Sequence, residues 1–146
     1  MSFSFSMIHS ITGRVMVFGT YDVFHPGHEY FIREAMKRSV ELSPNAQPDV
    51  VVVIARDVTV KKIKPLLRNT EEQRRKVIQS AFPNLQVVLG DEEDYMKVIR
   101  DYQPEKVCLG YDQKGFSEAL VKHFPEIEIE RTDSYFPEKY KSSKMD

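Results

Sequence analysis

The sequence is poor in features that would place it outside the cytosol. It contains a single cysteine, Cys108, so no disulfide framework can form within one chain, which suits a reducing compartment. No apolar run approaches the length of a membrane span. Residues 1–13 lack the basic start and the continuous apolar stretch of a signal peptide, and we interpret them as an N-terminal extension. We therefore predict a cytoplasmic protein with no membrane partner.

Excess charge, repeats and low-complexity tracts are also missing. The formal net charge is -1, which provides no general attraction to nucleic acid, so we predict no nucleic-acid partner. With 146 residues, of which 41% are hydrophobic, the chain is long enough for one domain with its own core. We assign that domain to residues 14–146.

Short apolar runs alternate with amphipathic segments along this domain. We predict strands at 14–18, 50–55, 85–89, 106–109 and 127–131, and helices at 27–42, 70–81, 95–101 and 116–123. Alternation of this kind indicates βαβ units, so the expected class is α/β, with a single Rossmann-like, doubly wound parallel sheet of about five strands. Cys108 falls within a strand, where a buried, inert thiol is expected. Ligands of such sheets bind beyond the carboxyl ends of the strands.

The stretch 15–35 joins a strand to a helix through a loop that contains two glycines and two histidines. Free N–H groups and the helix dipole make the start of such a helix an anion site. His25 and His28 lie three residues apart and can both face one polyphosphate. The same pair can instead cap the helix or bond within the core. Two histidines are too few for zinc, and Asp22 is expected to orient the loop rather than to bind metal.

Basic residues follow the second predicted strand. Lys61 and Lys62 lie in this cluster, which forms either a solvated surface or a site that offsets the repulsion between two phosphorylated substrates. Thr70 and Gln73 have the spacing of a capping box at the start of the next helix. Arg74, which follows at once, is either a site residue or part of a surface pair with a helix neighbour.

These motifs together resemble the cytidylyltransferase-like nucleotidyltransferases, whose HxGH motif is matched by 25–28. Further segments look like those of archaeal-type FAD synthases, which adenylylate FMN, and less closely like those of glycerol-3-phosphate cytidylyltransferases: 54–57, 59–62, 71–75 and 109–113. The resemblance extends from Arg14 to Lys144. It implies transfer of a nucleoside monophosphate from a triphosphate to a small phosphate ester, with ATP and FMN as the expected substrates and pyrophosphate as the second product.

The resemblance also implies roles for particular residues. His25, His28 and Lys62 are the expected catalytic residues. The expected nucleotide-binding residues are Phe18, Gly19, Thr20, His25, Gly27, His28, Gly110, Asp112, Gln113, Ser142 and Ser143. The acceptor phosphate is expected to meet Lys61, Lys62, Arg74 and Arg131. Asp112 is the expected ligand of magnesium or another divalent cation.

The second signature of the family departs from its usual form, because residues 133–140 are inserted after Arg131-Thr132. Three aromatic residues in this insertion, Tyr135, Phe136 and Tyr140, can stack on an isoalloxazine or a purine, or pack back onto the protein. Two alternatives therefore stay open. One is a CTP-dependent cytidylyltransferase that acts on glycerol 3-phosphate or a related alcohol phosphate, and the other is a non-catalytic nucleotide-binding module. The resemblance also implies a homodimer.

Overall fold

One five-stranded parallel sheet forms the centre of the protein, whose structure is a computed structural model. The structure describes residues 13–62, 67–110 and 114–131. The strands follow the spatial order β3-β2-β1-β4-β5, with bounds β1 (Arg14–Gly19), β2 (Asp49–Ile54), β3 (Gln86–Leu89), β4 (Lys106–Leu109) and β5 (Glu128–Arg131). The helices are α2 (Pro26–Leu42), α3 (Asp57–Lys61), α4 (Glu71–Ala81), α5 (Lys97–Tyr102) and α6 (Lys114–His123).

The central strands are built from branched apolar residues. β2 reads DVVVVI, and its last five residues are buried because helices cover both faces of the sheet. β1 pairs with β2 over its whole length, from Arg14 opposite Asp49 to Gly19 opposite Ile54, and with β4 on its other side. β1 is therefore the middle strand and its carboxyl end lies at the centre of one edge.

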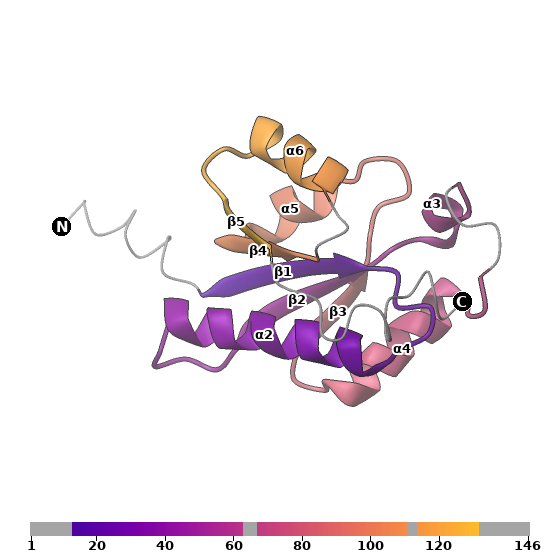
Figure 1. The fold of residues 1–146 in the computed structure, drawn as a ribbon, viewed down its shortest axis with the longest axis horizontal. Coiled ribbons are helices and arrows are strands. Elements are labelled where there is room, and N and C mark those ends of the chain that lie inside the picture. The colour runs from indigo at the N-terminus through magenta and orange to yellow at the C-terminus, as the bar shows by residue number, and fades with distance from the viewer. Residues whose placement is uncertain (1–12, 63–66, 111–113, 132–146) are drawn as a thin grey trace.

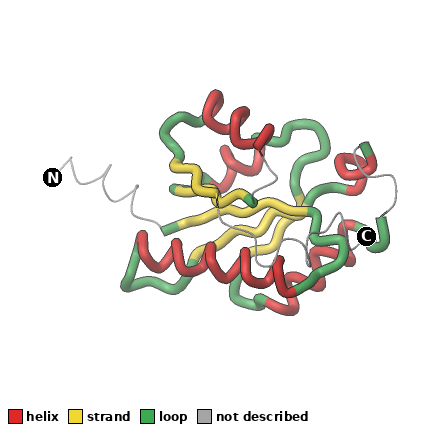
Figure 2. The backbone as a smooth tube through the Cα atoms, in the orientation of Figure 1, coloured by secondary structure: helices red, strands yellow, loops and turns green. Residues whose placement is uncertain are grey.

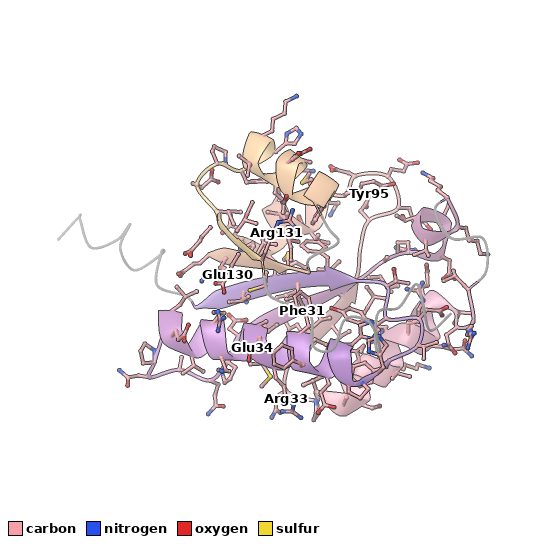
Figure 3. The ribbon with its side chains drawn as sticks, in the orientation of Figure 1. Phe31, Arg33, Glu34, Tyr95, Glu130 and Arg131 are labelled. Carbon is pink, nitrogen blue, oxygen red and sulfur yellow. The ribbon has the colours of Figure 1, made fainter. Side chains whose placement is uncertain are left out.

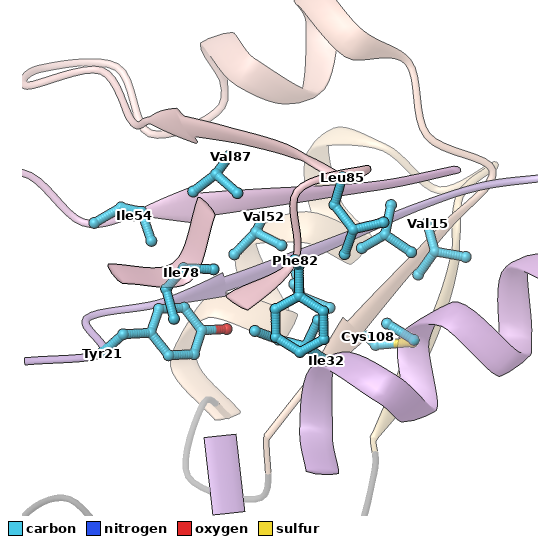
Figure 4. Packing of buried hydrophobic residues seen from close by; sticks show 13 residues of the cluster. Val15, Tyr21, Ile32, Val52, Ile54, Ile78, Phe82, Leu85, Val87 and Cys108 are labelled. Atoms are coloured by element: carbon cyan, nitrogen blue, oxygen red, sulfur yellow. The ribbon is translucent and has the colours of Figure 1, made fainter. Parts of the chain in front are cut away.

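Successive residues of β1 point to opposite faces and enter two separate cores. Val15 and Val17 pack with Ile32 of α2 and Ile78 of α4, whereas Met16 packs with the residues of α5 and α6. Figure 1 and Figure 2 show the resulting layers, with α2 and α4 on one face and α5 and α6 on the other. Figure 4 shows the first core, in which Tyr21 lies beside Ile78.

The predicted strands and helices are confirmed, with bounds that differ by one or two residues. The doubly wound parallel sheet is confirmed as well. The sequence did not predict α3, because it has five residues and a single buried side chain, Val60, too few to produce a helical period. Cys108 is buried as expected, and burial raises its pKa to about 12. No helix within the described ranges is both long enough and apolar enough to span a membrane.

The strand order reverses between β1 and β4. The chain proceeds outward from β1 through β2 to β3, and then returns to place β4 on the other side of β1. The loops that leave β1 and β4 therefore part at this point, where open α/β sheets bind their ligands. Figure 1 shows α3 beyond the same edge of the sheet as the start of α2.

Candidate active site

Two stacked imidazoles cap the start of α2. His25 is the N-cap residue, and its Nδ1 accepts a hydrogen bond of 3.1 Å from the N–H of Gly27. The N–H of His25 donates in turn to Nδ1 of His28 at 3.3 Å, which closes a capping box made of histidines. The ring centroids are 3.7 Å apart, with 23° between the planes. The two hypotheses for this pair, helix capping and polyphosphate binding, are therefore compatible.

This arrangement selects one form of each ring. Because each Nδ1 accepts an N–H, a neutral ring must carry its proton on Nε2, and Nε2 is then a hydrogen-bond donor. Burial lowers the pKa of His25 from its ordinary value. Protonation of its Nδ1 would also remove the cap bond from Gly27, so His25 is favoured as a neutral N–H donor.

Tyr21 supports His28 from the core side. Its backbone is left-handed, with φ 53°, and its ring meets the His28 ring edge-on at 5.0 Å between centroids. The tyrosine ring crosses β1 so closely that a Cβ on Gly19 would lie 2.6 Å from it. Only glycine fits there, so Gly19 makes room for Tyr21 in addition to any contact with a ligand.

Asp22 fixes the loop that follows β1. It is 3% exposed, and its carboxylate accepts the N–H groups of Arg68 at 2.9 Å and Asn69 at 2.9 Å. The loop before the histidines is thereby joined to the loop before α4. The predicted orienting role of Asp22 agrees with these bonds.

α3 carries the predicted acceptor lysines. Lys61 is its last residue and Lys62 is its C-cap, and both side chains are exposed. Within the described part of the chain, neither lysine has an ion pair or a hydrogen bond through its side chain. α3 lies beyond the edge at which the strands end (Figure 1), so both lysines lie at that edge.

Arg74 lies inside the protein, not on its surface. Its side chain is 0% exposed, and it donates to Asp57 Oδ1 at 2.7 Å, to the carbonyl oxygen of Thr20 at 2.9 Å and to that of Asn69 at 3.2 Å. Its neighbour Arg75 faces outward and pairs with Glu72. The predicted capping box of Thr70 and Gln73 is confirmed at the start of this helix.

A second arginine and a glutamate join α3 to β3 and α4. Arg56 donates to Glu71 at 3.2 Å and to the carbonyl oxygen of Gly90 at 3.2 Å, just after β3. Glu71 also accepts the N–H of Asp57 at 2.7 Å. Burial alone would raise the pKa of Asp57, but hydrogen bonds from Arg74 and the Glu71 backbone hold it below its ordinary value.

The other half of the sheet contributes an aromatic pair and an arginine. Phe18 meets Phe116 edge-on at 4.8 Å between centroids. Arg131, at the end of β5, donates to the carbonyl oxygen of Gly110 at 3.3 Å and to Ser117 Oγ at 2.9 Å. Figure 3 shows Arg131 on the side of α5 and α6, whereas Glu130 bonds to Arg38 of α2. Arg131 and Gly110 thus meet at the ends of neighbouring strands.

Several predicted residues cannot be placed. Asp112, Gln113, Ser142 and Ser143 lie outside the described residues, as does the insertion 133–140. Within the described ranges, no group of three His, Cys, Asp or Glu side chains is arranged to hold a metal ion. The carboxylates of Asp22 and Asp57 are engaged by protein N–H groups.

Sequence reasoning missed the links between these loops. Tyr21, Asp57 and Glu71 were not singled out, although each contacts a predicted site residue or the helix that carries one. The signals for Asp57 and Glu71 were their places directly after a strand and directly after a cap, and their membership of the family-like segments 54–57 and 71–75. Nothing in the sequence pattern indicates the left-handed backbone of Tyr21.

Comparison with known proteins adds relatives over most of the chain. The family model for cytidylyltransferase-like proteins matches residues 16–145. A curated FAD synthase from Aciduliprofundum boonei is 43% identical over 101 residues, which cover 69% of this chain and 62% of that protein. The FAD synthase of Thermoplasma acidophilum is 38% identical over 109 residues, which cover 75% of this chain and 70% of that protein.

A solved structure has the same arrangement of elements. The crystal structure of the lipopolysaccharide core biosynthesis protein from Thermoplasma volcanium superposes with a TM-score of 0.68 at 28% identity and covers 84% of this chain and 97% of that one. The match to the A. boonei relative spans less than two thirds of that protein's length, 62%.

Proposed function

The chain belongs to the cytidylyltransferase-like family, and from this premise we propose that it transfers AMP from ATP to FMN. An oxygen of the FMN phosphate attacks the α-phosphorus of ATP. The bond between that phosphorus and the bridging oxygen to the β-phosphate breaks, so the products are FAD and pyrophosphate. The choice of ATP and FMN is supported by the curated relatives, which are FAD synthases.

The observation that carries this proposal is the histidine capping box at the start of α2. The start of a helix of 17 residues presents the positive end of its dipole, and its first N–H groups bond to the cap residue His25. His25 and His28 add Nε2 donors at the same end, beside the point where the strand order reverses. We propose that this end of α2 binds the triphosphate and stabilises the charge that develops on it.

The acceptor needs positive charge but no general base. A phosphate monoester has a second pKa of about 6, so FMN is largely a dianion at neutral pH. Lys61 and Lys62 are exposed at the same edge of the sheet, and Arg131 lies at the end of β5. We propose that the two lysines attract and align the acceptor phosphate, with Arg131 and Gly110 at the opposite side of the site.

Magnesium, or another divalent cation, is proposed as the cofactor. The described residues hold no three-ligand group, which fits an ion held mainly by triphosphate oxygens and water. Asp112 is proposed as its carboxylate ligand. When bound, the ion would neutralise charge on the phosphates.

The direct test is product formation. The purified protein is mixed with magnesium, ATP and FMN, and FAD and pyrophosphate are measured by chromatography and a coupled assay. Formation of both in equal amounts supports the proposal. Pyrophosphate release only with CTP and glycerol 3-phosphate would replace it with cytidylyl transfer. Nucleotide binding without release of pyrophosphate from any pair would indicate a binding module.

A further inference from the structure

We propose that Arg74 is a positioning residue, which holds the lysines of α3 in place relative to the histidine pair of α2. This inference rests on the proposed function, and it gives Arg74 a different role from the acceptor-phosphate contact predicted from the sequence. The two halves of the site are the histidine pair of α2 and the lysines of α3, and Arg74 would keep them at a fixed relative position.

Arg74 joins the loops that lead to both halves. Its guanidinium donates to Thr20 in the loop that leaves β1, to Asp57 at the first position of α3, and to Asn69 in the loop before α4. Asn69 is itself bound to Asp22, three residues before His25. One side chain thus contacts the segment that leads into the histidines and the helix that carries the lysines.

The burial of Arg74 argues against direct contact with a phosphate. Its side chain is 0% exposed and already neutralised by Asp57 at 2.7 Å. A phosphate would have to displace this carboxylate, which would leave a charge unpaired in the interior at a cost of several kcal/mol. The planar guanidinium also satisfies separate acceptors in fixed directions, which a lysine cannot reproduce.

The helix α3 depends on these polar bonds for its orientation. It has five residues, of which only Val60 is buried, so apolar packing restrains it little. Its first residue, Asp57, is held by Arg74 from one side and by Glu71 from the other. Lys61 lies one turn after Asp57, so a shift of the first turn moves the lysine ends.

Loss of this register should affect the transfer step more than binding. ATP and FMN would each still find their own half of the site, but the acceptor oxygen and the α-phosphorus would be misaligned. A misplacement of about 1 Å can cost roughly a hundredfold in rate. The expected signature is therefore a lower kcat with KM values that change little.

The experiment compares Arg74→Lys with the matched control Arg75→Lys on the adjacent, outward-facing residue. Asp57→Asn is the second variant, because it removes the negative charge that holds Arg74 against α3 while changing the side-chain volume little, and it serves if Arg74→Lys does not fold. Thermal unfolding establishes that each variant is folded at the assay temperature. For Arg74→Lys and Asp57→Asn we expect kcat for FAD formation to fall tenfold or more, with KM for ATP and FMN within about threefold of wild type. Arg75→Lys should match wild type.

A double-mutant cycle tests the link to the lysines. In a Lys62→Ala background, the decrease in log kcat caused by Arg74→Lys should be less than half of the decrease that the same change causes in the wild type. The reason is that one of the groups positioned by Arg74 is then gone. Folded variants that retain wild-type kcat, or a rise in KM for FMN with kcat unchanged, would overturn the positioning role. Full additivity in the cycle would also overturn it. A wild-type protein that makes no FAD would instead overturn the proposed function, and this inference with it.

Discussion

The protonation of His25 sets a pH dependence for the folded protein. Its pKa is lowered by burial, so between about pH 6.5 and its lower folded value the unfolded chain binds more protons. The free energy of unfolding should therefore increase as pH rises through that window. The contribution of His25 to stability is lost as pH falls through it. We expect urea denaturation to show a steeper loss of stability from pH 7 to 5 in wild type than in His25→Asn.

Asparagine is the suitable replacement in that comparison because it can cap the helix but does not titrate. Nitrogen-15 NMR spectra of the wild-type imidazoles should show the proton on Nε2 of both rings. Equal pH slopes for the two proteins, or a proton on Nδ1, would contradict the capping geometry.

His28 should be required for turnover but not for folding. We expect His28→Ala to reduce kcat about a hundredfold or more, because loss of one preorganised donor has effects of that size. The control is His123→Ala, at the exposed end of α6. Steady-state FAD formation and circular dichroism check both points. Near-normal turnover of folded His28→Ala would mean that the capping box has a structural role and no catalytic one.

The residues of the capping box could be chosen from the sequence, but their protonation could not. The spacing of His25 and His28 places them at a helix start, whereas the acceptor role of each Nδ1 depends on the backbone N–H groups around it. Arg74 is the opposite case. Its position in the motif indicated a site residue, but only the three-dimensional contacts reveal that its guanidinium faces the interior.

The two ends of the helix α3 have different roles. Its first turn is anchored by Asp57, and its last residue and C-cap present Lys61 and Lys62. We expect Lys62→Ala to raise KM for FMN at low salt, because an attractive charge is lost. KM of the wild type should rise with salt as the charge is screened, and KM of the variant should rise less.

The matched control for this prediction is Lys76→Ala, an exposed lysine of α4. Kinetics for ATP and FMN at two salt concentrations provide the measurement. An unchanged KM for FMN in Lys62→Ala would mean that the basic segment is solvated surface.

The longer elements were predictable because their patterns repeat. β2 is an unbroken run of branched apolar residues, and α2 has apolar residues spaced by a helical turn. α3 was missed because one turn gives no repeat. The loops that complete the site were located by the strand ends alone, and their detailed geometry depends on polar bonds between distant segments.

For the whole molecule, the sequence correctly indicated the doubly wound sheet and the resemblance to FAD synthases. The alternation of elements determines such a sheet with few alternatives, since crossover connections are right-handed. The roles of Asp112, Gln113, Ser142 and Ser143 stay predictions, as does the homodimer, which light scattering on the purified chain would test.

The division into an N-terminal extension and one domain also has a test. Gly13 donates its N–H to Glu105 and its carbonyl oxygen accepts from Ser39 Oγ at 2.6 Å, so this residue is bound to the rest of the domain. We expect removal of residues 2–10 to leave FAD formation unchanged and to shift the melting temperature by about 2–4 °C at most. Loss of activity on removal would place those residues in the functional domain.

The return of the chain from β3 to β4 has a consequence for how the protein folds. β1 pairs with β2, β2 with β3 and β4 with β5, each with its successor in sequence. The pairing of β1 with β4 instead joins residues about ninety positions apart, as in the contact of Gly13 with Glu105. Distant contacts incur the larger loop-closure entropy and form late. During synthesis, the histidine pair and the anchored first turn of α3 can therefore assemble before the ribosome has released β4, and the proposed nucleotide site is complete only when that strand docks.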